Sequence, residues 1–228
     1  MAELTRRRDV VAGMGLAALA PMLACAREPQ SAAPAFGQGR LIAGESCPLT
    51  PRQTEGPFHF DPRLVRRDIR EGRPGVPLRL KVQVVGAADC SPAERARVDV
   101  WHCDAAGAYS GYDSERTAGE AWLRGTQLAD ADGVVEFETL YPGWYAGRAT
   151  HIHVKAWTTD RREIASQIYF PDDLSDRVYG ESPYRGRGVP RVRNGDDGLF
   201  RSGGERVPVA EVVRSSAGLV GAVVLALR

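Results

Sequence analysis

The chain has 228 residues, of which 43% are hydrophobic and 26% are charged, a composition typical of a globular protein long enough to bury one substantial core. The 30 Lys and Arg residues are balanced by 29 Asp and Glu residues, so no excess of positive charge indicates binding to nucleic acid or to an anionic membrane surface. These figures exclude a collagen-like chain, a wholly disordered chain and a polytopic membrane protein.

Residues 1–26 predict an export signal. A basic cluster, Arg6 to Arg8, precedes an apolar run from Val10 to Ala24 that is short for a membrane span and has the form of the hydrophobic region of a signal peptide. Adjacent arginines before a mildly hydrophobic, glycine-containing stretch are typical of twin-arginine export. An amphipathic first helix of a cytosolic protein would need polar residues on one face, and this run has none. We therefore expect an extracytoplasmic protein: periplasmic, secreted or lipid-anchored.

Two cleavage positions stay open, because both Ala18-Leu-Ala20 and Ala24-Cys-Ala26 have the small-x-small form. Met22-Leu-Ala-Cys25 is also similar to a bacterial lipobox, with Met in place of the usual branched residue, so Cys25 is a candidate lipid anchor. Residues 27–46 are rich in Ala, Pro, Gly and Gln without apolar periodicity, and this composition predicts a flexible spacer.

Residues 47–228 predict a single all-β domain, a two-sheet β-sandwich. Short runs rich in β-formers, separated by turn residues, predict strands at 78–85, 98–103, 134–140, 151–157, 164–169, 207–213 and 219–227. We expect residues 78–103 to form a hairpin with a long loop, and residues 111–125 and 174–193 to be loops. After the signal, no helical periodicity lasts for more than a few turns.

The remaining cysteines have no Cys-x-x-Cys spacing, so they do not predict a zinc site. An exported protein can keep disulfides. The expected hairpin places Cys90 and Cys103 at opposite ends, which is poor geometry for a bond between them. We expect Cys47 to pair with one of the two, leaving one free thiol.

The most informative segment is Tyr141–Lys155. On a strand, His151 and His153 point to the same face, where both imidazoles can reach one metal ion. Two polar positions on a solvated face are the plainer interpretation of a His-x-His pair. Tyr145 and Arg148, which lie six and three residues before His151, favour the metal site.

A second segment, residues 98–111, ends a predicted strand in a glycine-containing loop that presents Tyr109, with Tyr112 as a competing candidate. Two phenolate oxygens beside two imidazoles favour Fe(III), a hard ion whose charge lowers the pKa of a phenol. Zinc would more usually recruit Cys or a carboxylate beside the histidines.

Other polar and aromatic residues have plainer interpretations. His102 lies between Trp101 and Cys103 on a predicted strand, which favours structural packing, and Asp99 in the same strand needs a hydrogen-bond partner. His59 is a weaker candidate for the mouth of the pocket. Trp122, Trp144 and Trp157 are expected in the core or in a pocket wall.

Several ordered motifs resemble those of the intradiol ring-cleavage dioxygenases, the family of catechol, hydroxyquinol and protocatechuate dioxygenases. They are Thr54–Phe58, Val98–Trp101, Gly107–Tyr109, Pro142–Tyr145, Arg148–His153 and Gln167–Phe170. The resemblance covers the chain from about Thr50 onward. The helical N-terminal linker domain of catechol 1,2-dioxygenases has no counterpart in this sequence, so their mode of dimerisation is not expected here.

The resemblance implies a β-sandwich of the intradiol type and a role for each matching residue. Tyr109, Tyr145, His151 and His153 look like the four ligands of Fe(III), and Tyr145 also resembles the ligand that substrate displaces. Arg148 looks like the active-site arginine beside the metal. Gln167, Thr54, Gly56 and Pro57 resemble residues that line the substrate pocket.

The predicted function is therefore cleavage of catechol-type diols by O2, between the two hydroxylated carbons, to cis,cis-muconate-type products in the catabolism of aromatic compounds. The main alternative is a secreted β-sandwich that binds a metal or a catechol without turnover. A zinc hydrolase is the third interpretation.

Overall fold

The computed structural model describes residues 47–187 and 191–228; the predicted export signal (1–26) and spacer (27–46) lie outside these residues. Strands dominate the described chain. They are β1 (Pro77–Gly86), β2 (Arg97–Trp101), β3 (Arg124–Leu128), β4 (Val134–Leu140), β5 (His151–Trp157), β6 (Glu163–Tyr169), β7 (Glu211–Ser215) and β8 (Gly218–Leu227). Two short helices, α1 (Asp172–Tyr179) and α2 (Gly198–Gly203), and the 3-10 turns η1 (Asp113–Glu115), η2 (Asn194–Asp196) and η3 (Gly204–Arg206) complete the elements.

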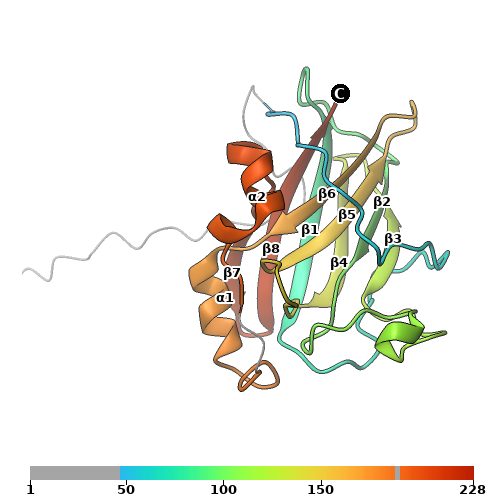
Figure 1. Ribbon diagram of the computed structural model, residues 1–228. Helices are drawn as coiled ribbons and strands as arrows, with labels where there is room; N and C mark the ends of the chain where they lie inside the picture. Colours follow the sequence, from blue (N-terminus) through green and yellow to red (C-terminus); the bar gives the residue numbers. More distant parts are fainter. Residues whose placement is uncertain (1–46, 188–190) are drawn as a thin grey trace, which may run out of the picture. The chain divides into compact units, whose positions relative to one another are not determined.

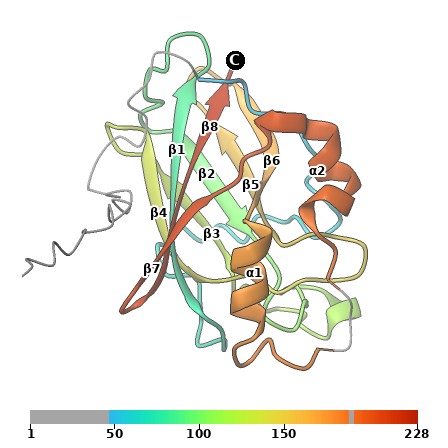
Figure 2. The same ribbon diagram turned by 90° about the vertical axis from the view of Figure 1, so that its left-hand side faces the viewer.

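The strands form two four-stranded sheets that pack face to face (Figure 1). One sheet has the order β4-β1-β8-β7, with β1 and β8 parallel and the other pairs antiparallel. The second sheet has the order β3-β2-β5-β6 and is antiparallel throughout. Figures 1 and 2 show α1 and α2 along one side of the sandwich, with α2 beside β6. The prediction of an all-β two-sheet sandwich is confirmed.

The hydrophobic core lies between the sheets and follows from the alternation in each strand. Leu78, Leu80 and Val82 of β1 face Ile152 and Val154 of β5 across this core, all fully or almost fully buried. Burial of these side chains is the main stabilising contribution, at roughly 25 cal/mol per Å² of apolar surface removed from water. The alternate residues of β5, beginning with His151, therefore point out of the sandwich.

The predicted hairpin over residues 78–103 is wrong. β1 pairs with β4 and β8, whereas β2 pairs with β3 and β5 in the other sheet. The long connection between β1 and β2 passes from one sheet to the other. Alternation within each segment identified both strands, but it carries no information on which strand is the partner.

One strand boundary differs markedly from the prediction, and two elements, β3 and α1, were not predicted. β7 begins at Glu211 rather than at residue 207, because the preceding residues run beside β6, where the Tyr169 amide donates to the Pro208 carbonyl (2.8 Å). β3 lies at the end of the predicted loop 111–125 and beyond it. α1 occupies the first part of the predicted loop 174–193. Neither helix exceeds eight residues, in agreement with the sequence pattern, which has no long helical periodicity. None of the described helices has the length and apolar character that crossing a bilayer needs.

Cys47 and Cys90 form a disulfide, and Cys103 is a buried free thiol, which confirms the expected pairing of Cys47 with one of the two. The bond joins the start of the described chain to the turn after β1. It therefore fixes one end of residues 47–60, a segment that reaches the candidate site described below.

His102 has a structural role, as predicted, and Asp99 has the hydrogen-bond partners that its position requires. The His102 ring lies 2.8 Å from the Cys103 carbonyl through Nδ1 and 2.7 Å from the Thr139 hydroxyl through Nε2. Because a carbonyl only accepts, Nδ1 carries the proton, and the Thr139 hydroxyl donates to Nε2. Thr139 belongs to β4, so this bond joins the two sheets.

Asp99 accepts from Arg97 (Nε, 2.9 Å) and from the Thr126 hydroxyl (2.7 Å), so its carboxylate is satisfied on the outer face of the second sheet. Trp122 and Trp144 are buried, as expected. Trp157 is only partly buried, and Arg97 and Lys155 lie over its ring, so it belongs to the outer surface of the sheet rather than to the core.

Candidate functional site

The candidate site lies on the outer face of the sheet β3-β2-β5-β6. Because successive side chains of a strand alternate, Ile152 and Val154 enter the core while His151 and His153 point away from it. Register places Trp101 of β2 beside His153, and Gln167 of β6 on its other side. His151 is paired in the same way with Tyr169.

The two imidazoles direct nitrogen atoms at each other. His151 Nε2 lies 3.1 Å from His153 Nε2 and 3.1 Å from the hydroxyl of Tyr145. His151 Nδ1 donates to the Ala149 carbonyl (2.7 Å), so Nε2 of this ring keeps its lone pair. Both side chains are almost completely buried. The lone pair of His151 Nε2 therefore points at His153 Nε2, and Nδ1 of His153 has no hydrogen-bond partner among the described residues.

Burial controls the charge of both imidazoles. It lowers the pKa of His151 to about 3, and the nearby positive charge of Arg148 acts in the same direction. The pKa of His153 is also well below its ordinary value, because of burial and then because of His151 and Arg148. Both rings are therefore neutral at pH 7 and able to ligate a cation.

Tyr109 and Tyr145 complete the cluster from two loops. Tyr109 follows β2 and Tyr145 follows β4; their ring centroids are 5.7 Å apart, and that of Tyr109 is 6.2 Å from His153. The Tyr109 hydroxyl is buried, and its interaction with the Tyr145 hydroxyl falls short of full hydrogen-bond geometry. Burial raises the pKa of both phenols, so each keeps its proton until a cation binds nearby.

Tyr112, the competing candidate, lies elsewhere in the loop. Its ring meets Phe58 and Phe60 edge-on, at centroid distances of 5.1 Å and 5.9 Å. Phe58 also stacks on Tyr109 (4.4 Å, 10° between ring planes) and separates the two tyrosines. The geometry therefore favours Tyr109 as the residue that faces the histidines.

A buried arginine that the sequence did not single out holds the Tyr109 loop. Arg124, at the start of β3, donates to the Ser110 hydroxyl (2.9 Å) and carbonyl (2.9 Å) and to the Phe58 carbonyl (2.7 Å). Burial lowers its pKa to about 10, which leaves the guanidinium charged at pH 7. Arg124 thus connects the loop of Tyr109 with the segment that stacks on it.

Arg148 is held in place by three side chains on the approach to the histidines. Its Nε donates to Asp197 (3.0 Å), and its Nη2 donates to Gln167 and to the Tyr169 hydroxyl (3.2 Å). The Tyr169 hydroxyl also donates to Gln167 (3.0 Å). The guanidinium therefore stays beside the cluster with a fixed orientation.

The segment predicted to line the pocket lies against the same residues. Gln167 Nε2 donates to the Thr54 carbonyl (3.2 Å). Gly56 has a φ of +71°, and a Cβ at this position would lie 3.2 Å from Cε1 of His153. Thr54 and Pro57 are exposed at this edge. Thr54, Gly56 and Gln167 are thus brought together, with Pro57 next to them in the chain.

His59 does not join the donor cluster. Its Nδ1 pairs with Glu55 (3.1 Å), and its ring packs on Trp101 (4.4 Å between centroids). Trp101 in turn stacks on His153, with 5.0 Å between centroids and 5° between planes. The ring of Trp101 therefore lies between His59 and the candidate donor His153, and His59 supports the site by packing on Trp101.

Asp197 and Tyr169, like Arg124, were not predicted as site residues. Tyr169 could have been found, because it lies two residues after Gln167 and so shares its strand face. Asp197 precedes α2 in a stretch of Asn, Gly and Asp residues that resembles any loop, and only the folded chain places it beside Arg148.

The donor set fits a hard trivalent cation. Within residues 47–187 and 191–228, no group of three or more His, Cys, Asp or Glu side chains could hold a metal, so any centre here must use the tyrosines. Two neutral imidazoles whose Nε2 atoms lie close together, beside one buried and one partly buried phenol, suit a hard cation such as Fe(III). The structure thus brings the four predicted ligands together, and their role as ligands stays a prediction.

Comparisons with known proteins give a consistent family. A family profile described as "Dioxygenase" matches residues 54–177. The chain is 28% identical to catechol 1,2-dioxygenase 1 of Acinetobacter lwoffii over 54% of this chain and 47% of that protein. It is 32% identical to hydroxyquinol 1,2-dioxygenase of Nocardioides simplex over 55% and 50%, respectively. The chain thus spans about half the length of the curated relatives it matches.

A solved structure agrees over more of the chain. The intradiol ring-cleavage dioxygenase from Tetranychus urticae has a TM-score of 0.75 and 32% identity, and the match covers 80% of this chain and 95% of that one. The dioxygenase domain of a carbohydrate-binding fusion from Streptomyces sp. SirexAA-E has a TM-score of 0.60 at 32% identity, covering 79% and 99%. This chain therefore belongs to the intradiol ring-cleavage dioxygenase family.

Proposed function

We propose that the protein is an iron-dependent intradiol dioxygenase that opens catechol-type diols with O2, between the two hydroxylated carbons, to cis,cis-muconate-type products. The observation that carries the proposal is the convergence of two neutral imidazoles and two tyrosine hydroxyls on one sheet face, with a fixed guanidinium beside them. Membership of the family supports the reaction type.

Tyr109, Tyr145, His151 and His153 would hold the iron. When bound, Fe(III) would supply Lewis acidity and a template on which the diol and O2 meet. The raised pKa of each phenol means that metal binding must release protons from the tyrosines. Tyr109, which is more deeply buried than Tyr145, would be the donor that stays bound throughout.

Tyr145 has the features of a proton acceptor. It is partly exposed, unlike Tyr109, and its hydroxyl is within 3.1 Å of a histidine nitrogen. A diol that binds through both oxygens must lose its protons, and a phenolate at Tyr145 can take one of them. Arg148 supplies positive charge where negative charge grows on the ring, and Phe58 stacked on Tyr109 excludes water from the buried side.

The deciding experiment is turnover of iron-loaded protein in an oxygen electrode, with catechol, hydroxyquinol and protocatechuate in parallel. We expect one iron per chain, a visible tyrosinate-to-iron absorption and oxygen uptake with at least one diol. Absorption that shifts with a diol without oxygen uptake would support a binding protein instead. A colourless zinc protein that consumes no oxygen would support a hydrolase.

We also propose that the protein is exported through the twin-arginine route, with lipid attachment at Cys25. The basic cluster Arg6 to Arg8 and the apolar run after it support this, and the Cys47–Cys90 disulfide suits an oxidising compartment. Replacing Arg6 to Arg8 by Lys should keep the protein in the cytoplasm. Cys25→Ser should release exported protein from the membrane fraction; unchanged distribution in either variant would contradict the corresponding part.

A further inference from the structure

Asp197 uses its two carboxylate oxygens for two different tasks. Oδ1 accepts from the Leu199 amide (2.8 Å) and caps the N-terminus of α2. Oδ2 accepts from Arg148 Nε (3.0 Å) and from the Ala149 amide (2.9 Å). The side chain is only 1% exposed. A buried carboxylate with three strong donors is rigid, and it transmits that rigidity to each of them.

The hydrogen bonds of Arg148 leave one edge of its guanidinium available. Nε is committed to Asp197, and Nη2 is committed to Gln167 and Tyr169. Among residues 47–187 and 191–228, no hydrogen bond reaches Nη1. The side chain as a whole is 19% exposed, so this edge can meet a ligand. Fixing two nitrogens therefore determines the direction in which the third one points.

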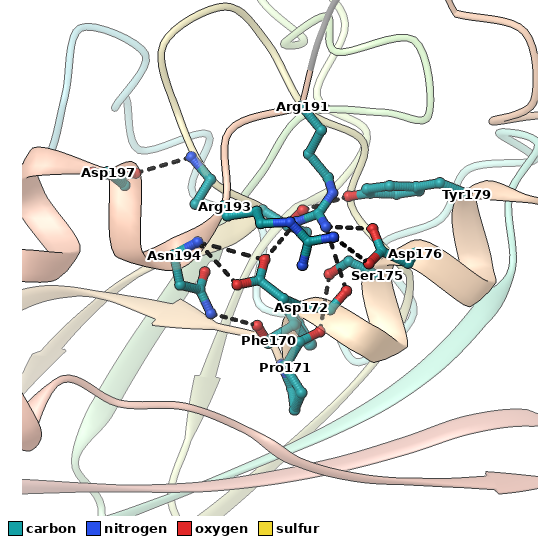
Figure 3. A network of polar contacts seen from close by, with 12 residues as sticks. Phe170, Pro171, Asp172, Ser175, Asp176, Tyr179, Arg191, Arg193, Asn194 and Asp197 are labelled. Atoms are coloured by element: carbon teal, nitrogen blue, oxygen red, sulfur yellow. Dashed lines mark hydrogen bonds and ion pairs between the residues drawn. The ribbon is translucent and has the colours of Figure 1, made fainter.

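The segment that carries Asp197 is itself anchored to α1 (Figure 3). Arg191 reaches Asp172 (2.6 Å) and Asp176, and Arg193 also reaches Asp176 (2.8 Å). Asn194 donates through its side chain to the Phe170 carbonyl (2.8 Å), directly after β6. Asp197 is thus connected by a network of polar contacts to the end of the strand that carries Gln167.

The Ala149 peptide extends the effect of Asp197 to a histidine. Its N–H donates to Asp197, and its carbonyl accepts from His151 Nδ1 (2.7 Å). One carboxylate therefore lies behind both the guanidinium and the peptide that fixes the tautomer of His151.

From this geometry we propose that Asp197 is the positioning residue for Arg148: it orients the guanidinium so that Nη1 faces the bound diol. The inference rests on the proposed function for its catalytic consequence. Its structural part, the dependence of the Arg148 orientation on Asp197, stands without it.

The test distinguishes two roles of Asp197: capping the N-terminus of α2 and orienting Arg148. Asp197→Ser keeps an oxygen suited to the cap of α2 but is too short to reach Arg148. Asp197→Asn keeps the volume of the side chain and one acceptor oxygen but removes the charge. This variant replaces Asp197→Ser in the test if the Ser variant does not fold. Asp196→Ser is the matched control, because Asp196 is exposed and lies one residue away.

We expect kcat per bound iron to fall about tenfold or more in Asp197→Ser, to fall less in Asp197→Asn, and to stay unchanged in Asp196→Ser. In an Arg148→Gln background, Asp197→Ser should cause a much smaller loss, because only its bond to the Ala149 amide then remains to be removed. An equal loss in both backgrounds, or normal turnover of Asp197→Ser, would overturn the proposal.

A second readout does not depend on catalysis. In the 1H–15N spectrum of the metal-free protein, the Nε–H of Arg148, assigned by its disappearance in Arg148→Gln, should exchange slowly with solvent. This slow signal should be lost in Asp197→Ser and kept in Asp196→Ser. If the wild type cleaved no diol but the signal behaved in this way, the proposed function would fail and the positioning role would stand. A slow signal that survives in Asp197→Ser would refute the positioning role itself.

Discussion

Gly56 offers the smallest perturbation that tests the candidate metal centre. Its φ of +71° is unfavourable for residues with a Cβ, and an added Cβ would lie 3.2 Å from Cε1 of His153, closer than ordinary van der Waals contact at 3.4–4 Å. Gly72 is a matched control, since it has the same φ of +71° but no atom within 4 Å of an added Cβ. The two Gly→Ala variants therefore share the backbone cost and differ in the contact with the histidine.

The backbone cost is about 1–2 kcal/mol for an alanine in the left-handed region. Both variants should lose this amount of unfolding free energy, measured by urea denaturation of the metal-free protein. Only Gly56→Ala must also displace the His153 ring, or itself, by a few tenths of an ångström. Displacement of a metal ligand by its neighbours typically costs 10–100-fold in metal affinity, and we expect a loss of about that size for iron in Gly56→Ala alone.

Competition with a chelator, followed by the visible absorption of the iron form, measures this affinity. Equal iron affinity in Gly56→Ala and Gly72→Ala would refute the reasoning, because the contact with His153 would then have no consequence for the centre. A large additional loss of stability in the metal-free Gly56→Ala protein would also contradict it, since the conflict would then lie in the fold rather than at the donor.

Four further predictions concern other parts of the structure. Thr139→Val should lower the unfolding free energy by about 1–3 kcal/mol, because it leaves buried His102 Nε2 without its donor. Burial lowers the pKa of His102 from 6.5 to about 4, so the folded protein binds fewer protons than the unfolded chain between these values. The unfolding free energy should therefore fall as pH falls from 6.5 to 4, and urea unfolding that shows no such fall would contradict this reasoning. Arg148→Gln should keep iron and colour but lose roughly a hundredfold of turnover, and loss of iron would instead make Arg148 structural. Cys47→Ser should lower stability by roughly 4 kcal/mol, because the disulfide to Cys90 spans 43 residues, and an unchanged thermal midpoint would count against this value.

Local pattern predicted every strand except β3, because the alternation of a strand depends only on its own residues. The alternation around His151 and His153 identified β5, its core face and its outer face. Strand pairing is a contact between distant segments, and the hairpin predicted over residues 78–103 failed for this reason. The start of β7 was displaced because pairing with β6 competes for the same residues.

The candidate donors could also be predicted from the sequence, because each belongs to a short motif with its own spacing. The residues that hold these donors in position could not be predicted. Arg124 lies within a stretch predicted as loop, and its role depends on its contacts with Ser110 and Phe58, 14 and 66 residues away in the chain. The role of Asp197 likewise depends on its contact with Arg148 in the folded chain, which no local sequence pattern predicts.

β5 carries core and site residues in strict alternation, and this has an evolutionary consequence. A one-residue insertion or deletion in β5 would exchange its faces, moving His151 and His153 into the core and Ile152 into the site, so fold and chemistry would fail together. Residues 54–60, which lie against the donors, are outside the strands and contribute no donor, so they can change while the histidines keep their places. Selection for new diols can therefore act on residues 54–60, whereas the length of β5 is fixed by two independent requirements.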